Sequence, residues 1–206
     1  MPHLIKNLRE FSGIHKGEKI VVCGCGMSLL DFKEHHHDFI TIGVNDVGAL
    51  FDPTYLLVTD HAGRFNGVDR KNRVMRSTAK HLFTCAKGWR HTSLVHFELG
   101  NRSLGNLDNP DKLDHYLNSP YAAVNLAYKM GASHIGLIGV DFTDGHFYNP
   151  KDGKHPLMRS NYLAKLNSAY QVLTTELAKR GTILVNLSPI SNLALRKMSV
   201  KEFKKL

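Results

Sequence analysis

The sequence has few cysteines and no long apolar run. Its 206 residues include three cysteines, Cys23, Cys25 and Cys85, too few for a disulfide framework, and the first two are too close for the usual disulfide or metal clip. No apolar stretch approaches the roughly 18 residues that a membrane-spanning helix needs. Residues 1–13 also lack the apolar core of a secretory signal. We therefore expect reduced thiols, no membrane span and a cytoplasmic location.

The composition is that of an ordinary globular protein. Hydrophobic residues make up 42% of the chain and charged residues 22%, which excludes disordered and fibrous classes. A chain of this length buries about two thirds or more of its unfolded surface. No internal repeat or low-complexity linker divides the sequence, so we predict one domain over residues 1–206.

Positive charge exceeds negative charge. There are 27 Lys and Arg against 18 Asp and Glu, a formal net charge of +9, and such a surplus favours anionic partners such as phosphates, acidic sugars or nucleic acid. Between residues 64 and 90 the one acid, Asp69, stands among Arg64, Arg70, Lys71, Arg73, Arg76, Lys80, Lys87 and Arg90. This stretch is either a solvated helix face or a surface that attracts anions.

Apolar runs alternate with helical patterns along the chain. β-Branched runs bounded by turn residues predict buried strands at 19–24, 39–44, 55–59, 135–140 and 182–187, with weaker candidates at 81–85 and 93–97. Helical spacing predicts helices over 4–11, 121–130 and 161–179. Strands that are apolar throughout and alternate with helices indicate a parallel sheet covered on both faces. The predicted fold is therefore α/β: a single-domain, Rossmann-like, mostly parallel open sheet with helices on both faces.

One connection is unusually long. Residues 143–159 are rich in Asp, Gly, His, Asn, Pro and Lys and fit no helix or strand. Long structureless connections inside compact domains are usually lids or binding loops. We predict a lid loop here that becomes ordered when a ligand binds.

Polar residues follow several of the predicted strands. In an open α/β sheet, ligands bind outside the carboxyl ends of the strands. The first buried strand ends in a Gly-Cys-Gly-Met-Ser turn, residues 24–28, which could bind a phosphate. Leu29 replaces the third glycine of a dinucleotide fingerprint, and no GK[ST] motif is present. The other polar strand ends, each of which could also be a simple cap or turn, are 45–46, 59–61, 141 and 186–189.

These motifs resemble a known superfamily of Rossmann-like transferases. It includes the bacterial family 42 sialyltransferases and the domain shared by motility accessory factors and archaeal 6-hydroxymethylpterin pyrophosphokinases. The likeness lies in the order and spacing of six segments, 21–29, 41–46, 53–60, 119–131, 135–148 and 185–189. The segment Phe142 to Tyr148 is closer to the motility-factor side of the superfamily.

The resemblance implies a nucleotide site but supplies no residue for the general base of the reaction. Matching positions for nucleotide contacts are Gly24, Gly26, Ser28, Asn45, Asp60, Asn118, Ser119 and Asp141. The base histidine of the sialyltransferases falls near Ala164, an apolar residue of a predicted helix. Our candidate catalytic residues are therefore in the loop: His155 first, then His146 and Tyr148. His155 precedes Pro156 in a polar segment where an imidazole titrates near neutral pH, although a loop histidine can also be simply solvated.

The sequence thus favours a nucleotide-binding transferase that uses a nucleotide-activated sugar and an unknown acceptor. The ligand it implies is a nucleotide or nucleotide-sugar donor, and Asp60, Asp141 and Asp144 could hold Mg²⁺ beside its phosphates. Three consecutive histidines, residues 35–37, do not converge easily on one ion, so no metal site is predicted. Two alternatives remain open: ATP-dependent pyrophosphoryl transfer, and a non-catalytic module that binds nucleic acid through residues 64–90.

Overall fold

A parallel sheet forms the centre of the molecule. The computed structural model describes residues 5–65, 68–148 and 162–206. Within these residues eight strands form one sheet in the order β1-β6-β5-β4-β3-β2-β9-β10, and every neighbouring pair is parallel. The strands are β1 (Ile5–Asn7), β2 (Lys19–Cys23), β3 (Ile40–Val44), β4 (Tyr55–Val58), β5 (His81–Thr84), β6 (Leu94–His96), β9 (His134–Ile138) and β10 (Ile183–Asn186). The predicted Rossmann-like α/β fold is confirmed.

The strand order reverses beside β2. From β2 the chain adds β3, β4 and β5 on one side, and it later crosses to place β9 and β10 on the other. The point between β2 and β9 is therefore the topological switch point, where open α/β sheets leave a crevice at the strands' carboxyl ends.

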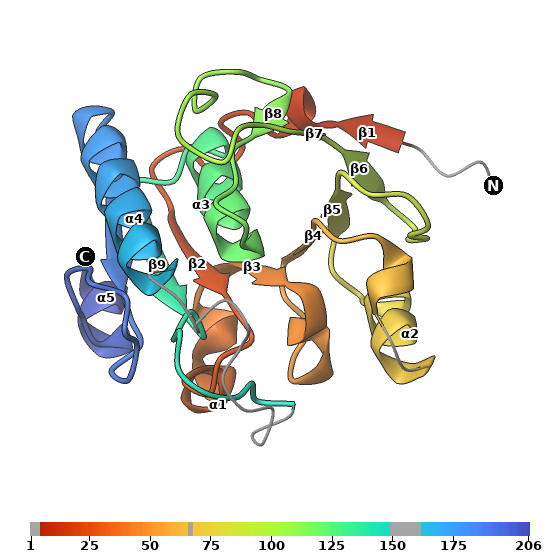
Figure 1. The fold of residues 1–206 in the computed structure, drawn as a ribbon, viewed down its shortest axis with the longest axis horizontal. Helices are drawn as coiled ribbons and strands as arrows, with labels where there is room; N and C mark the ends of the chain where they lie inside the picture. The colour runs from red at the N-terminus through yellow and green to blue at the C-terminus, as the bar shows by residue number, and fades with distance from the viewer. Residues whose placement is uncertain (1–4, 66–67, 149–161) are drawn as a thin grey trace.

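Helices cover both faces of the sheet (Figure 1). The α-helices are α1 (Leu29–Phe32), α2 (Val68–Arg76), α3 (Ser119–Lys129), α4 (Tyr162–Lys179) and α5 (Val200–Lys205). Short 3-10 helices are η1 (Leu8–Phe11), η2 (Lys33–Asp38), η3 (Asn45–Ala49) and η4 (Ala62–Arg64). No helix among the described residues is long and apolar enough to cross a membrane.

The alternation of side chains along β2 explains why both faces are covered. Ile20 and Val22 are buried with α3 and α4, whereas Val21 and Cys23 are buried with α1 and α5 on the opposite face. Because successive side chains of a strand point to opposite faces, a strand that is apolar throughout needs a helix layer on each side. The helix α2 covers β4 and β5 on the α1 face through Val74.

The predicted helix over residues 4–11 is wrong. Residues Ile5–Asn7 form β1, which pairs in parallel with β6 at the edge of the sheet. Leu8 and Phe11 are buried, so the apolar spacing of three residues is real, but a single 3-10 turn satisfies it. Pairing with the sheet edge supplies backbone hydrogen bonds that local helical spacing does not anticipate.

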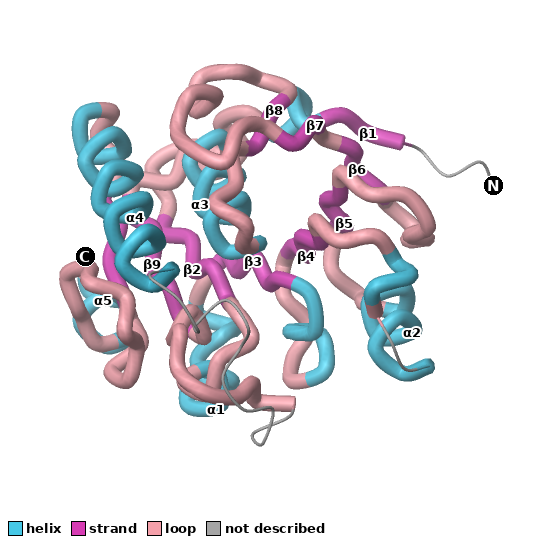
Figure 2. Tube along the Cα trace, viewed as in Figure 1, coloured by secondary structure: helices cyan, strands magenta, loops and turns pink. Residues whose placement is uncertain are grey.

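The connection between β6 and α3 is mostly loop (Figure 2). It contains only the short parallel pair β7 (Glu98–Leu99) and β8 (Lys112–Leu113). The buried carboxylate of Asp114 accepts hydrogen bonds from the backbone N–H groups of Asn101, Gly105 and Asn106 at 2.7 to 2.9 Å. A loop without regular structure is therefore fixed by one buried acid.

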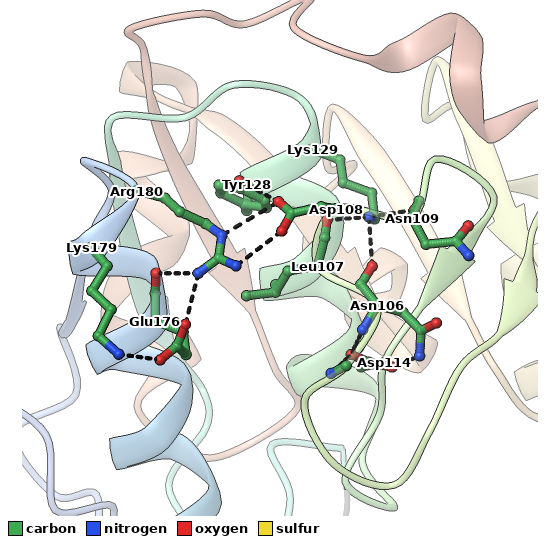
Figure 3. Close-up of polar contacts among 11 residues, drawn as sticks. Asn106, Leu107, Asp108, Asn109, Asp114, Tyr128, Lys129, Glu176, Lys179 and Arg180 are labelled. Atoms are coloured by element: carbon green, nitrogen blue, oxygen red, sulfur yellow. Dashed lines mark hydrogen bonds and ion pairs between the residues drawn. The ribbon is translucent and has the colours of Figure 1, made fainter.

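Lys129, at the end of α3, fixes the same loop from the other side (Figure 3). Its ammonium donates to the carbonyl oxygens of Asn106, Leu107 and Asn109 at 3.0, 2.5 and 2.7 Å. Burial lowers the pKa of Lys129, while nearby aspartates oppose that shift. Beside it, Arg180 pairs with Asp108 and Glu176 at a more exposed position.

Replacing Lys129 with Met should destabilise the protein by about 1–3 kcal/mol, because three carbonyl groups lose their donor in a partly buried place. The matched variant is Lys179→Met, which removes an exposed ammonium that bonds Glu176. It should change stability by no more than about 0.5 kcal/mol. Urea unfolding of both variants is the measurement, and equal losses of stability would contradict the role given to Lys129.

Candidate functional site

A cavity of about 410 Å³ opens at the carboxyl ends of the central strands. It adjoins the switch point, because its lining includes Gly26 after β2 and Asp141 after β9. The predicted site residues that line this cavity are Gly26, Asn45, Asp60, Asn118, Ser119, Asp141 and His146. Segments more than a hundred residues apart in the sequence thus meet at one place.

The glycine turn after β2 is packed tightly against the end of β9. Gly24 N–H donates to Ile138 O and Gly26 N–H donates to Gly139 O, both at 2.7 Å. A Cβ at Gly24 would lie 2.8 Å from the carbonyl carbon of Gly139. The turn needs glycine because two backbone segments approach too closely for a side chain between them. These two N–H groups are committed within the protein, and the turn forms part of the cavity wall.

The carboxylate of Asp141 is the hub of this region. The side chain is buried, and it accepts hydrogen bonds from Ser28 N–H at 2.9 Å and from the hydroxyls of Ser28 and Ser188 at 2.6 Å each. Ser28 Oγ in turn accepts from Gly139 N–H at 2.9 Å. Asp141 therefore connects the ends of β2, β9 and β10. Ser28 lies beneath the cavity rather than in its lining.

Asn45 combines a strained backbone with an unsatisfied polar atom. Its φ is 52°, in the left-handed region that few non-glycine residues adopt. Its Oδ1 is buried and accepts no hydrogen bond from the described residues. Buried acceptors without a donor cost about 1–3 kcal/mol. An unsatisfied oxygen in a cavity wall is a position where a ligand can donate a hydrogen bond.

Backbone strain is concentrated around this cavity. Leu117, with φ of 55°, and Phe142, with φ of 50°, also line it. Together with Asn45 they are the non-glycine residues with positive φ in the described ranges. Each such conformation costs of the order of 1–3 kcal/mol, and these conformations cluster at ligand sites.

Asp46, the residue after Asn45, is buried and forms a partly buried ion pair with Arg70 of α2. Arg70 Nε and Nη2 bond the two carboxylate oxygens at 3.0 and 2.6 Å. Hydrogen bonding to Asp46 is the main cause of the raised pKa of the Arg70 guanidinium. The same guanidinium lies 4.9 Å from the Phe65 ring centroid and 5.2 Å from that of Tyr148. Arg70 thus joins β3, α2 and the segment after β9, a role that its place in a basic stretch did not reveal.

Of the three candidate catalytic residues, His146 lines the cavity, Tyr148 does not, and His155 lies outside the described residues. His146 lines the cavity and stacks on Tyr148 with ring centroids 5.1 Å apart. Tyr148 lies over Arg70 and is not part of the lining. His155 and residues 149–159 of the predicted lid lie outside the described residues. Ala164, where the resemblance places a base, lies on α4 and lines a different cavity.

Asn118 and Ser119 are positioned by the start of α3. Asn118 Oδ1 caps the helix by accepting from Tyr121 N–H at 2.9 Å, and it also accepts from Tyr170 Oη at 3.0 Å. Ser119 Oγ bonds Thr59 Oγ1 at 2.9 Å. These bonds fix the part of the cavity wall that Asn118 and Ser119 form.

Asp60 and Cys25 also line the cavity. Asp60 pairs with Arg64 at 3.0 Å. In the described ranges no three His, Cys, Asp or Glu side chains are grouped so as to hold a metal ion. Burial, followed by the Asp46 carboxylate, raises the pKa of Cys25 to about 12. Cys25 therefore lines the cavity as a neutral thiol at physiological pH.

The chain is similar in structure to two solved transferases. No family profile matches the chain, and no curated protein matches it significantly. The solved MAf glycosyltransferase from Magnetospirillum magneticum AMB-1 superposes with a TM-score of 0.56 at 12% identity. The sialyltransferase CstII from Campylobacter jejuni, in complex with cytidine-5'-monophosphate, superposes with a TM-score of 0.52 at 14% identity.

The chain has the fold of these transferases. The likeness covers 94% of this chain and 37% of the Magnetospirillum protein, so the chain spans little more than a third of that protein. It covers 89% of this chain and 86% of CstII. A second CstII structure, with a trisaccharide acceptor and CMP, gives the same TM-score of 0.52. The resemblance inferred from the sequence motifs is confirmed at the level of the fold.

Replacing Gly26 with Ala should destabilise the protein by about 1–3 kcal/mol. The added Cβ would lie 2.7 Å from Asp141 Cγ and 2.8 Å from Gly139 O, so the hub would have to move. The matched variant is Gly48→Ala, whose Cβ would meet nothing closer than Ser77 Oγ at 4.0 Å. Thermal unfolding of both variants is the measurement, and a Gly26→Ala protein as stable as Gly48→Ala would show that the turn is not packed as described.

Proposed function

We propose that this protein is a transferase of the glycosyltransferase type that binds a nucleotide-activated sugar in the cavity at the switch point. The proposal is supported by the shared fold with the MAf glycosyltransferase and with CstII, whose structures include complexes with CMP. It is also supported by the position of the cavity, where α/β sheets of this type bind ligands.

The observation that carries the proposal is the unsatisfied side-chain oxygen of Asn45. A side-chain carbonyl held in a strained backbone, buried and without a donor, is stabilised when a ligand supplies an N–H or O–H group. A nucleotide offers both groups, on its base and on its ribose. We therefore assign Asn45 to nucleoside recognition, with Asp60, Asn118 and Ser119 on the same lining. Gly24, Ser28 and Asp141 hold the turn that shapes the site.

In the proposed transfer, an acceptor hydroxyl oxygen attacks the anomeric carbon of the donor sugar. The bond from that carbon to the phosphate oxygen breaks, and its electron pair leaves with the nucleotide. The acceptor proton passes to a general base, and positive groups stabilise the leaving phosphate. His146 is the described candidate for the base because it lines the cavity, and His155 remains a prediction of the sequence. Arg64 lines the same cavity and would exchange its ion pair with Asp60 for one with the leaving phosphate. Tyr148 stacks on His146.

The two alternatives drawn from the sequence remain predictions. Pyrophosphoryl transfer from ATP would use the same cavity with Mg²⁺. A nucleic-acid module would use the basic stretch 64–90, in which Arg64 and Arg70 are already paired with Asp60 and Asp46. Phosphate-backbone contacts weaken steeply with salt, so a salt-dependent gel shift identifies the second alternative.

A thermal-shift screen against CMP, CDP, UDP, GDP, ADP and ATP, with and without Mg²⁺, tests the proposal. One nucleotide class should stabilise the protein by about 2.7 kcal/mol at a hundred times its dissociation constant. The variant Asn45→Gly keeps the positive φ but removes the carbonyl, so it should fold and bind that nucleotide about tenfold more weakly.

The control is Asn101→Gly, the same substitution at an exposed residue outside the cavity. It should bind the nucleotide as tightly as the parent protein. If no nucleotide stabilises the parent protein, or if both variants bind equally well, the proposed function is wrong.

A further inference from the structure

A second cavity of about 510 Å³ adjoins the first. The two cavities share five lining residues, Asp60, Arg64, Leu117, Asn118 and Ser119. The two cavities therefore border each other along these residues. Two adjoining cavities suit a reaction between two substrates, one in each cavity.

The second cavity carries a surplus of positive charge. Arg64 and Lys87 line it, and Asp60 is the one acidic residue in its lining. Because Asp60 pairs with Arg64 at 3.0 Å, the charges of these two side chains offset each other. Lys87 is exposed and forms no ion pair within the described part of the chain. Its ammonium remains available to an anionic group.

Two histidines add hydrogen-bonding groups to this charge. His61 Nδ1 accepts a hydrogen bond from Gly63 N–H at 3.0 Å, so the neutral ring carries its proton on Nε2. This Nε2–H group can donate a hydrogen bond to a ligand. His115 also lines the cavity. Burial, and next the charge of Arg102, lower its pKa, so its ring is neutral at physiological pH and can donate one hydrogen bond. His61 therefore adds one donor to the lining, and the neutral ring of His115 adds one donor and one acceptor.

The second cavity also has apolar surface. Leu99 and Leu117, which line it, are 40% and 44% exposed. Leu117 also has a positive φ and stands where the two cavities meet. Binding sites for small molecules typically combine such apolar surface with a few placed polar groups. A pyranose ring matches this lining, since its C–H face is apolar and its substituents are polar.

We propose that the second cavity is the acceptor subsite and that it selects a saccharide bearing a carboxylate or a phosphate. The anionic group would lie against Lys87 and the His61 Nε2–H donor, and the sugar ring against Leu117, next to the donor cavity. The description of this ligand as an acceptor rests on the proposed function. The selection of an anionic saccharide rests only on the lining of the cavity.

Three methyl glycosides that differ only at carbon 6 test the proposal: methyl galactoside, methyl galactosiduronic acid and methyl galactoside 6-phosphate. Each is titrated into ¹⁵N-labelled protein, and binding is followed by amide chemical shifts. At least one acidic sugar should shift the amides of residues 86–88 and 117–119 and bind about three- to tenfold more tightly than methyl galactoside. A preference between the two acidic sugars distinguishes carboxylate from phosphate.

The matched variants are Lys87→Gln and Lys71→Gln. Both remove one exposed ammonium from the basic stretch, but Lys71 lies on α2 outside both cavities. Lys87→Gln should reduce the preference for acidic sugars to about onefold to threefold, and Lys71→Gln should leave it unchanged. Absence of acid-dependent shifts in the second cavity, or equal effects of the two variants, would overturn the proposal.

Nucleotide titrations on the same samples separate this inference from the proposed function. If acidic sugars bind in the second cavity while no nucleotide binds in the first, the anionic subsite stands and the transferase assignment fails. If a nucleotide binds in the first cavity while acidic and neutral sugars bind equally, the nucleotide site stands and the anionic subsite fails.

Discussion

The buried carboxylate of Asp141 holds the functional region together. It bonds Ser28 after β2 and Ser188 after β10, while its own backbone follows β9. Parallel strands are joined by crossover connections and not by hairpin turns. The loops at their carboxyl ends therefore need other interactions to fix them in place. Here one acid fixes three of these loops at the switch point. The glycine turn, the floor of the first cavity and the start of α1 all depend on this contact.

The rigid sheet explains how the site can remain strained. Side chains of the central strands are fully buried on both faces, so the strand ends have little freedom to relax. The left-handed residues Asn45, Leu117 and Phe142 lie where the chain leaves β3, approaches α3 and follows β9. A packed scaffold thus supports unfavourable conformations and an unsatisfied oxygen at the place where a ligand would compensate for them.

Much of this fold could be predicted from the sequence because it depends on local patterns. Apolar β-branched runs identified the central strands, and glycines ended α3 and α4 close to their predicted limits. The edge strand β1 was missed because its pairing with β6 joins residues some ninety positions apart, as in Ile5 with Leu94. Local spacing could not anticipate that contact.

The candidate site was predictable in outline but not in its bonds. The rule for open α/β sheets brought Asn45, Asp60 and Asp141 to one edge. It could not show that Asp141 would bond two serines, that Asp46 would pair with Arg70, or that Asn45 would lack a donor. These features depend on side-chain orientation in the folded chain. The positive φ of Asn45 had one signal in the sequence, since asparagine tolerates that conformation better than most residues.

Mapping of a nucleotide titration by ¹H–¹⁵N NMR is the most direct test of nucleotide binding in the cavity at the switch point. If the nucleotide binds there, the largest amide shifts should occur at residues 25–28, 45, 118–119 and 139–142, which surround the cavity. Shifts concentrated on the basic helix α2, with these residues unchanged, would contradict binding in the cavity.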